Sequence, residues 1–257
     1  MLISETQEAQ IADLEAKMLH FYQTVPDYTA FENTSHHPAL WDRVIQHVRS
    51  WSATDPIRIL EVGAGRSGFA RYLQKHAPEL RCRLHLGFQD VTAKNEDFLR
   101  DEGDSVFIGR VEAVEGEWHV VMHAYVLEHV VRPISFFESI LRLLAPGGFH
   151  LFLSPRYDRV VYLPPALDHL SRGERWAIAY KAAFSNRGFW LLSDPAALHL
   201  PFQRDRDAVH PVSRRAIVHL HRDRARVTSF PLPSGSLKDY ILKAFLTARM
   251  EIQKLPA

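Results

Sequence analysis

Residues 57–69 read IRILEVGAGRSGF. An apolar run suited to a buried strand leads into a loop with the glycine spacing G-x-G-x-x-G, which is typical of a nucleotide-binding turn. Backbone N–H groups at such a turn favour a negative group on a ligand. Glu61, however, places a carboxylate just before the first glycine, where a ligand with an ammonium group would be preferred. The stretch therefore predicts a strand, a ligand-binding loop and a helix, and it leaves open which ligand the loop holds.

The bulk composition describes an ordinary globular chain. Its 257 residues allow one large domain, and 46% of them are hydrophobic and 24% charged. Lys and Arg number 31 against 30 Asp and Glu, so the chain has no global basic field that would gather nucleic acid. The single cysteine, Cys82, excludes an internal disulfide and indicates a reducing compartment. Since the N-terminus lacks a signal-peptide pattern and no apolar run reaches the length of a membrane span, we expect a cytoplasmic α/β protein.

Hydrophobic periodicity predicts strands that alternate with helices. Short runs of strand type occupy residues 57–62, 82–88, 106–111, 119–122 and 149–153. Three- and four-residue spacing predicts helices over residues 5–23, 37–51, 68–76 and 133–144. This alternation indicates a parallel sheet with right-handed crossovers, which binds ligands at the carboxyl ends of its strands.

The pattern is looser after Pro155. Residues 156–188 suit helices and loops. Strand candidates follow in GFWLL (188–192), AIVHLH (216–221) and RVTSF (226–230). Ser236 and Asp239 form a capping-box arrangement, which predicts a final helix over residues 236–254.

Two further stretches extend the pattern of the glycine loop. Residues 123–133 read HAYVLEHVVRP, and residues 141–155 read LRLLAPGGFHLFLSP. Together with ILEVGAGRSG (59–68), and in this order, they resemble the class I S-adenosylmethionine-dependent methyltransferases. The resemblance implies a doubly wound α/β fold, which is a mostly parallel, seven-stranded Rossmann-like sheet with helices on both faces. It also implies N-terminal helices and a helical insertion that together form a cap.

The resemblance divides one integrated domain into three regions. Residues 1–52 are expected to form an N-terminal helical cap. Residues 53–155 are expected to form the core that binds S-adenosylmethionine. Residues 156–257 are expected to supply a substrate-facing insertion, the C-terminal part of the sheet and the final helix.

S-adenosylmethionine is the cofactor that the resemblance implies. The glycine loop would approach its methionine part, and Glu61 would hold the amino group directly or through water. Asp90 would accept hydrogen bonds from the ribose hydroxyls, because one carboxylate can serve two neighbouring hydroxyls. The residues implied near adenine depart from the family pattern, since Arg110 stands where an acid is common. The expected cofactor-binding residues are Glu61, Gly63, Ala64, Gly65, Gln89, Asp90, Val111 and Glu112.

The implied chemistry is an in-line displacement at a sulfonium methyl group, which chiefly needs alignment of the reactants. His129 is a candidate general base for a hydroxyl acceptor, and a structural histidine beneath the site is the alternative. Tyr125 stands where relatives with the pattern E-x-x-E-H have a metal-ligating glutamate, so no metal is expected. HAYV replaces the [DNS]-P-P-[YF] motif of amino-methylating enzymes, which favours O-methylation.

The acceptor is expected to be a small molecule whose identity the sequence leaves open. Candidate contacts are Tyr125, Arg156, Tyr157 and His210. The last of these lies in RDRDAVHPVS (204–213), a segment that suits either a pocket-lining loop or a solvated surface loop. The arginines of residues 201–230 leave an anionic acceptor open, whereas their interleaved aspartates and the lack of an aromatic series disfavour nucleic acid.

Two other functions remain open. An NAD- or flavin-dependent oxidoreductase satisfies the glycine spacing, but Glu61 and the VLEHV and APGGF stretches oppose it. A non-catalytic module that binds S-adenosylmethionine is the second alternative, because Arg110, Trp118, His119 and Tyr125 depart from the family pattern. The oligomeric state is not predicted.

Overall fold

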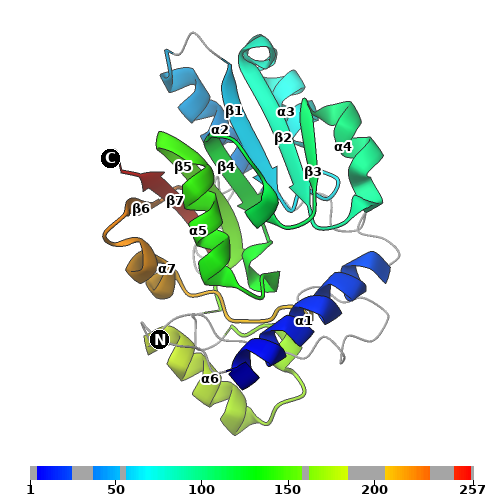
Figure 1. Cartoon of the computed structure of the whole chain (residues 1–257). Coiled ribbons are helices and arrows are strands. Elements are labelled where there is room, and N and C mark those ends of the chain that lie inside the picture. Colours follow the sequence, from blue (N-terminus) through cyan, green and yellow to red (C-terminus); the bar gives the residue numbers. More distant parts are fainter. Residues whose placement is uncertain are drawn as a thin grey trace.

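The computed structural model describes residues 5–24, 37–52, 56–157, 162–184, 206–231 and 246–255. Its centre is a seven-stranded sheet with the strand order β3-β2-β1-β4-β5-β7-β6 (Figure 1). β7 runs antiparallel to both of its neighbours, whereas the other strands run parallel, so the prediction of a mostly parallel sheet is confirmed. The strands are β1 (Ile57–Val62), β2 (Leu84–Asp90), β3 (Ser105–Ile108), β4 (Trp118–Ala124), β5 (Leu144–Pro155), β6 (Ala225–Ser229) and β7 (Thr247–Lys254).

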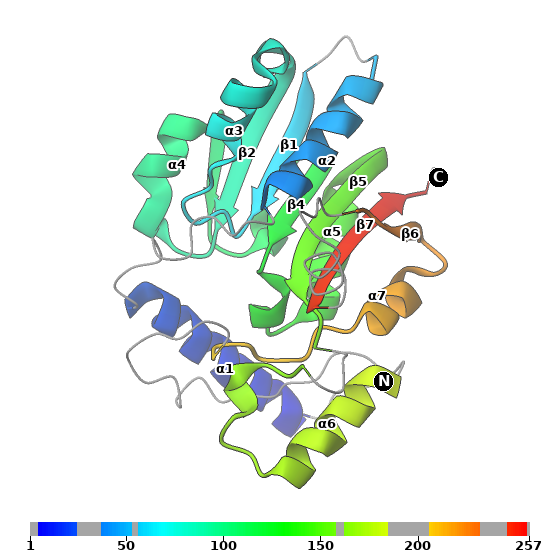
Figure 2. The ribbon, with the colours of Figure 1, turned by 180° about the vertical axis from the view of Figure 1, so that it is seen from behind.

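Helices cover both faces of the sheet (Figures 1 and 2). Helices α2, α3 and α4 pack on one face through residues that include Trp41, Leu73 and Leu99. Helices α5 and α7 pack on the other face through residues that include Phe137 and Ile217. The helices are α1 (Glu5–Thr24), α2 (His37–Ser50), α3 (Phe69–His76), α4 (Glu96–Glu102), α5 (Pro133–Leu143), α6 (Arg172–Phe184) and α7 (Arg214–His221), and the short 3-10 helices are η2 (Pro78–Arg83), η3 (Ala93–Asn95), η4 (Val111–Ala113), η5 (Leu127–His129) and η6 (Pro165–Leu167).

Strand β1 shows why the central strands are continuous apolar runs. It lies between β2 and β4, and helices cover both of its faces. Ile59 therefore enters the core beneath α2 and α3, while its neighbour Leu60 enters the core beneath α5. Because both faces of β1 are buried, apolar and polar residues do not alternate along it as they do in a strand with one exposed face.

The carboxyl ends of the parallel strands meet at one edge of the sheet. The order of strands reverses between β1 and β4, so the loops that follow these two strands diverge and leave a crevice between them. Helices α1 and α6 lie beyond this edge (Figure 1). No helix within the described ranges is long and apolar enough to span a membrane.

The segment AIVHLH (216–221), which we expected to be a strand, belongs instead to helix α7. Ser213 caps the first turn, because its Oγ accepts a hydrogen bond from the N–H of Ala216 at 3.3 Å. Ile217 and His221, one helical turn apart, are both fully buried. The burial therefore follows the helical spacing, and the strand prediction was wrong.

The last part of the chain also differs from its prediction. The final helix expected over residues 236–254 is wrong over Thr247–Lys254, which form strand β7. Met250 and Ile252 alternate into the core beneath α5, and this two-residue period is that of a strand. Residues 236–245 and the strand candidate GFWLL lie outside the described residues. The strand predicted in RVTSF is confirmed as β6.

Candidate cofactor cavity and active site

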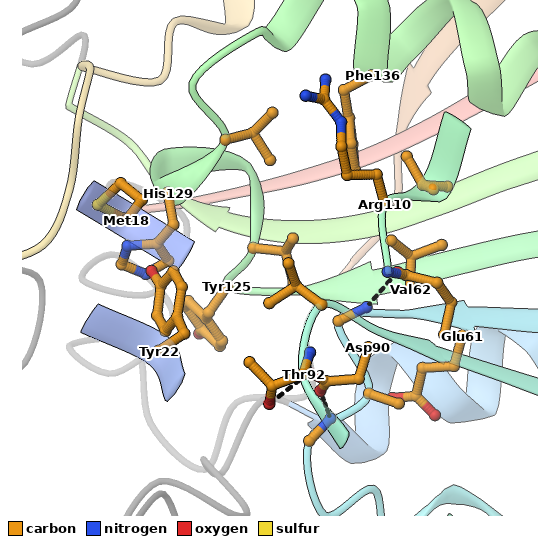
Figure 3. Close-up of a pocket in the computed structure, with 18 of the residues that line it drawn as sticks. Met18, Tyr22, Glu61, Val62, Asp90, Thr92, Arg110, Tyr125, His129 and Phe136 are labelled. Atoms are coloured by element: carbon orange, nitrogen blue, oxygen red, sulfur yellow. Dashed lines mark hydrogen bonds between the residues drawn. The ribbon is translucent and has the colours of Figure 1, made fainter. Parts of the chain in front are cut away.

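A cavity of about 480 Å³ lies at the crevice between the carboxyl ends of β1, β2 and β4. Loops after these strands line it, and helix α1 forms a further wall. Glu61, Asp90 and Thr92 lie at one end of the cavity, whereas Tyr22 and His129 lie at the other (Figure 3). We refer to these as the cofactor end and the acceptor end.

Two glycines of the loop have a left-handed backbone that disfavours any side chain. The φ angles are +63° at Gly63 and +54° at Gly65. A Cβ at Gly63 would lie 2.5 Å from Cγ2 of Val126, so this glycine permits close packing between the loop and the chain after β4. A Cβ at Gly65 would have no atom within 4 Å. The open space beside Gly65 is therefore available to a ligand.

Gln89, at the end of β2, holds the glycine loop in place. Its side-chain Oε1 accepts from the N–H of Gly63 at 3.2 Å, and its backbone carbonyl accepts from the N–H of Ala64 at 2.9 Å. Its Nε2 donates to the carbonyl of Gly109, which follows β3. The residue thus ties three loops of the sheet edge together.

The carboxylate of Asp90 is built into the same edge. Its Oδ2 accepts from the N–H of Gly65 at 2.8 Å, and its Oδ1 accepts from the N–H of Thr92 at 3.0 Å. Burial raises the pKa of Asp90, although the hydrogen bonds from the backbone of Thr92 and Gly65 lower it. Oδ1 also accepts from Oγ1 of Thr92 at 3.5 Å, and Asp90 lines the cavity, where its carboxylate can face hydroxyl groups of a ligand.

Glu61 is a buried acid that faces the cavity. Its side chain belongs to a residue that is only 5% exposed, and its Oε2 accepts a hydrogen bond from Ser67 Oγ at 2.5 Å. Burial raises the pKa of Glu61 to about 7, while the hydrogen bond from Ser67 lowers it. A buried carboxylate in this state is stabilised by a cationic group of a ligand.

Val111 and Glu112, the residues that the resemblance implies near adenine, also line the cavity, and Glu112 forms an ion pair there. Val111 is buried in η4, and Glu112 beside it accepts from Arg110, with Oε1 3.1 Å from Nη2. The Nη1 atom of Arg110 lies 2.7 Å from Oε1 of Glu15 on helix α1. Arg110, the departure from the family pattern, therefore joins the cofactor end to α1.

Tyr125 has a strained backbone at the acceptor end. It is the one non-glycine residue of the described ranges with a positive φ, at +57°. Its N–H donates to the carbonyl of Leu153 at 2.9 Å, which fixes the turn after β4. Its ring lies 5.9 Å from the ring of His37, and both side chains line the cavity. Strain of this kind costs about 1–2 kcal/mol and is concentrated at functional sites.

His129 contacts a buried aspartate that the sequence did not single out as its partner. The Nδ1 atom of His129 lies 3.2 Å from Oδ2 of Asp207, which is 1% exposed. Tyr22 Oη donates to the same Oδ2 atom at 2.8 Å. On its other side, His129 Nε2 lies 3.8 Å from Oε1 of Glu128, which is beyond hydrogen-bond distance. His129, Asp207 and Tyr22 all line the cavity.

Three expected acceptor contacts do not lie at the cavity. Tyr157 is fully buried, and its ring packs 5.2 Å from that of Tyr162. His210 is also fully buried, and burial lowers its pKa to about 3. Arg156 donates its N–H to the carbonyl of Leu246 at 2.7 Å, next to the start of β7. None of these three residues lines the cavity, so the structure brings only Tyr125 of the four candidates to it.

The structure answers an open question about the segment RDRDAVHPVS. Residues 207–213 are buried, so the surface-loop alternative is wrong for this part of the RDRDAVHPVS segment. Its apolar residues Ala208, Val209 and Val212 were the signal for burial in the sequence. Within the described part of the chain, no group of three or more His, Cys, Asp or Glu residues is arranged to hold a metal ion.

Comparison with known proteins identifies the family. A model of the methyltransferase domain matches residues 34–223, which is more than half of the chain. A search among curated proteins found no match. Similar solved structures include the CurJ carbon methyltransferase, with 16% identity and a TM-score of 0.53 over 95% of this chain and 59% of that one.

Two other solved structures show the same fold. The CMeT domain of the citrinin polyketide synthase has 14% identity and a TM-score of 0.51 over 83% of this chain and 51% of that one. An S-adenosylmethionine-dependent methyltransferase from Mesorhizobium loti has 13% identity and a TM-score of 0.53 over 84% and 96%. This chain thus spans 59% and 51% of the CurJ and citrinin structures.

The cavity fits the cofactor of this family. Glu61 offers a buried acid to an ammonium group, Asp90 offers carboxylate oxygens to hydroxyls, and Gly65 leaves space against the backbone. A nicotinamide or flavin cofactor has no ammonium group to meet Glu61. The chain therefore belongs to the methyltransferase-domain family, and it shares its fold with S-adenosylmethionine-dependent methyltransferases.

Proposed function

We propose that the chain methylates an oxygen atom of a small acceptor and that His129 is the general base. The observation that carries this proposal is the contact between His129 Nδ1 and buried Asp207 at the acceptor end of the cavity. An imidazole beside a carboxylate is suited to remove a proton. A hydroxyl must lose its proton on methylation, whereas an amine that is already neutral needs no base.

The cofactor end of the cavity would hold S-adenosylmethionine. Glu61 and the loop of Gly63, Ala64 and Gly65 would hold the methionine part, while Gln89 keeps that loop in position. Bound there, the cofactor supplies an electrophilic methyl group on a sulfonium that leaves as a neutral thioether. The ribose hydroxyls would meet Asp90, and adenine would lie beside Val111 and Glu112.

Two buried acids lie beside His129. Asp207 lies against Nδ1, and a carboxylate there favours the tautomer with the proton on Nδ1, which leaves Nε2 to accept the proton of the acceptor. Glu128 is also buried, and its Oε1 lies 3.8 Å from Nε2 of His129. In this proposal Asp207 sets the orientation of His129.

The walls of the acceptor end select a largely apolar acceptor. Met18 of α1 and Tyr125 lie at this end (Figure 3), and Leu19 of α1 and Trp41 of α2 also line the cavity. The arginines of α7 and β6 do not line it, so the structure lends no support to an anionic acceptor at those residues. We propose a small molecule with an apolar or aromatic body and one ionisable hydroxyl.

The test compares turnover of His129→Gln with that of the wild type on a panel of small phenols and enols, using cofactor with a labelled methyl group. Loss of about 10²- to 10⁴-fold in turnover with unchanged affinity for S-adenosylhomocysteine is expected. His219→Gln, on the exposed side of α7, is the matched control. Full activity of His129→Gln would refute the base, and cofactor binding without turnover by the wild type on any acceptor would support a non-catalytic module.

A further inference from the structure

Helix α1 is joined to the core through a small apolar contact. Leu14 and Met18 of α1 pack with Val131 and Val209 in a cluster separate from the two layers on the sheet. Such a contact is far smaller than either core layer, so α1 can separate from the cavity while the sheet and its covering helices stay folded.

Ion pairs hold α1 over the cofactor end. Glu15 lies between two arginines of the core, with Oε1 2.7 Å from Arg110 Nη1 and Oε2 2.9 Å from Arg132 Nε. Glu15, Arg110 and Arg132 all line the cavity. The carboxylate of Glu15 therefore links Arg110, which precedes η4, to Arg132, which precedes α5. This link crosses the region that would hold adenine.

The same face of α1 reaches the catalytic base. Tyr22 follows Glu15 by seven positions, which places both on one side of the helix, and the two residues line opposite ends of the cavity. Tyr22 Oη donates to Asp207 Oδ2 at 2.8 Å, and this oxygen is the atom that contacts His129 Nδ1 at 3.2 Å. The hydroxyl of Tyr22 thus fixes the rotation of the carboxylate that orients His129.

We propose that α1 is a lid and that Tyr22 is a positioning residue for His129, brought to Asp207 when the lid closes over the cofactor. The proposal rests on the proposed role of His129 as the base. Glu15 and Tyr22 lie on one rigid helix. Closure through the Glu15 ion pairs and the contact of Tyr22 with Asp207 beside His129 therefore occur together. The base is then complete only when the cofactor end is covered, which ties acceptor activation to an occupied site.

The first test follows release of S-adenosylhomocysteine by stopped-flow, with the fluorescence of Trp41 in the cavity as the signal. Glu15→Gln removes both ion pairs of Glu15 but leaves the pair between Glu8 and Arg132, and it should speed release about fivefold, since each lost pair is only partly buried. Asp13→Asn is the control, because Asp13 pairs with Lys17 on α1 itself. Equal release rates in Glu15→Gln and the wild type would overturn the lid.

The second test records the imidazole N–H signals of the protein saturated with S-adenosylhomocysteine, by proton and nitrogen NMR. The wild type should show a His129 Nδ1–H protected from exchange, identified by its loss in His129→Gln. Tyr22→Phe should lose this protection while affinity for S-adenosylhomocysteine stays within about threefold. Tyr72→Phe is the control, since the Tyr72 hydroxyl bonds Asp42.

A protected His129 signal in Tyr22→Phe would overturn the positioning role. Neither experiment uses turnover, so their failure is distinct from failure of the proposed base. If His129→Gln keeps full turnover while Glu15→Gln and Tyr22→Phe behave as expected, the lid stands and its effect on catalysis is refuted.

Discussion

Cofactor binding should depend on pH near neutrality, because Glu61 ionises there in the free protein. Burial raises the pKa of Glu61 to about 7, against the lowering effect of the Ser67 hydrogen bond. An ammonium group bound beside Glu61 favours the ionised carboxylate and so lowers this pKa. Affinity for S-adenosylhomocysteine should therefore rise as the pH rises through about 7 and level off above it.

The pKa of Glu61 sets the size of the effect. At a pKa of about 7, roughly nine tenths of the carboxyl is ionised at about pH 8 and roughly one tenth at about pH 6. S-adenosylhomocysteine should thus bind about tenfold more weakly at the lower pH, a difference of about 1.4 kcal/mol. At the lower pH, binding should also release close to one proton, in about one-to-one ratio with the ligand.

Glu61→Gln separates the binding role of Glu61 from its effect on folding. Glutamine keeps an oxygen for the Ser67 hydroxyl but carries no charge, so affinity should fall and its pH dependence should vanish. The free variant should be more stable by up to roughly 3 kcal/mol at about pH 8. The variant is more stable because the native pKa of Glu61, about 7, lies above the ordinary 4.5. At a pH above these values, the ionised carboxylate therefore destabilises the folded wild type.

Titration calorimetry measures the effect of pH on affinity, and two buffers of different ionisation enthalpy count the protons released. Urea unfolding gives the stability of Glu61→Gln, and Glu138→Gln, on the exposed side of α5, is the matched control. An affinity of the wild type that stays constant between about pH 6 and pH 8 would refute the reasoning. So would tight, unchanged binding by Glu61→Gln.

Two further predictions concern the glycine loop and a buried histidine. Gly65→Ala should lose at least about tenfold in affinity for S-adenosylhomocysteine by calorimetry but only about 1–2 kcal/mol of stability. Gly63→Ala should lower the melting temperature more, because its Cβ would meet Val126 at 2.5 Å; the opposite order of melting temperatures would contradict this. Burial lowers the pKa of His123 to about 3, below the ordinary 6.5. The stability that neutral His123 contributes is therefore fully present above the ordinary pKa, and it is lost as the pH falls from there towards the native pKa. His123→Phe should therefore reduce the stability lost between about pH 7 and pH 5.5 by about 1.3 kcal/mol in urea unfolding, and an equal loss in variant and wild type would contradict it.

The core of the fold could be predicted because its signals are local. Each of residues 57–62, 84–90 and 118–124 is a short, largely apolar run before a loop, since helices cover both faces of these strands. The loop at Gly63 and Gly65 follows directly from residue spacing, and the structure places both glycines in the left-handed region. The same local reasoning singles out Glu61, whereas Asp90 is a candidate only through the family resemblance.

At the acceptor end, Tyr125 and His129 could be predicted, but the partners of His129 could not, because contacts between distant segments bring them together. Tyr22 and Asp207 are 185 positions apart in the sequence, and no local pattern joins them. The segment that carries Asp207 is polar in composition but buried, since the N–H of Val209 donates to the carbonyl of Glu128 at 2.8 Å. This contact brings a charged segment inside the molecule, against the ordinary expectation for such residues.

Helix α7 and strand β7 show the limits of periodicity in short segments. AIVHLH contains apolar residues at both strand and helix spacing, and the cap at Ser213 decides for the helix. Residues 247–254 lie beside β5 in an antiparallel pair whose partner is about a hundred positions away. Pairing with the sheet overrides the capping pattern that precedes this segment.

A crystal structure of the chain with S-adenosylhomocysteine tests the central claim most directly. The account predicts the ligand in the crevice between β1 and β4, with its amino group at Glu61, its ribose at Asp90 and its sulfur facing His129. A ligand bound elsewhere, or one whose amino group points away from Glu61, would contradict it.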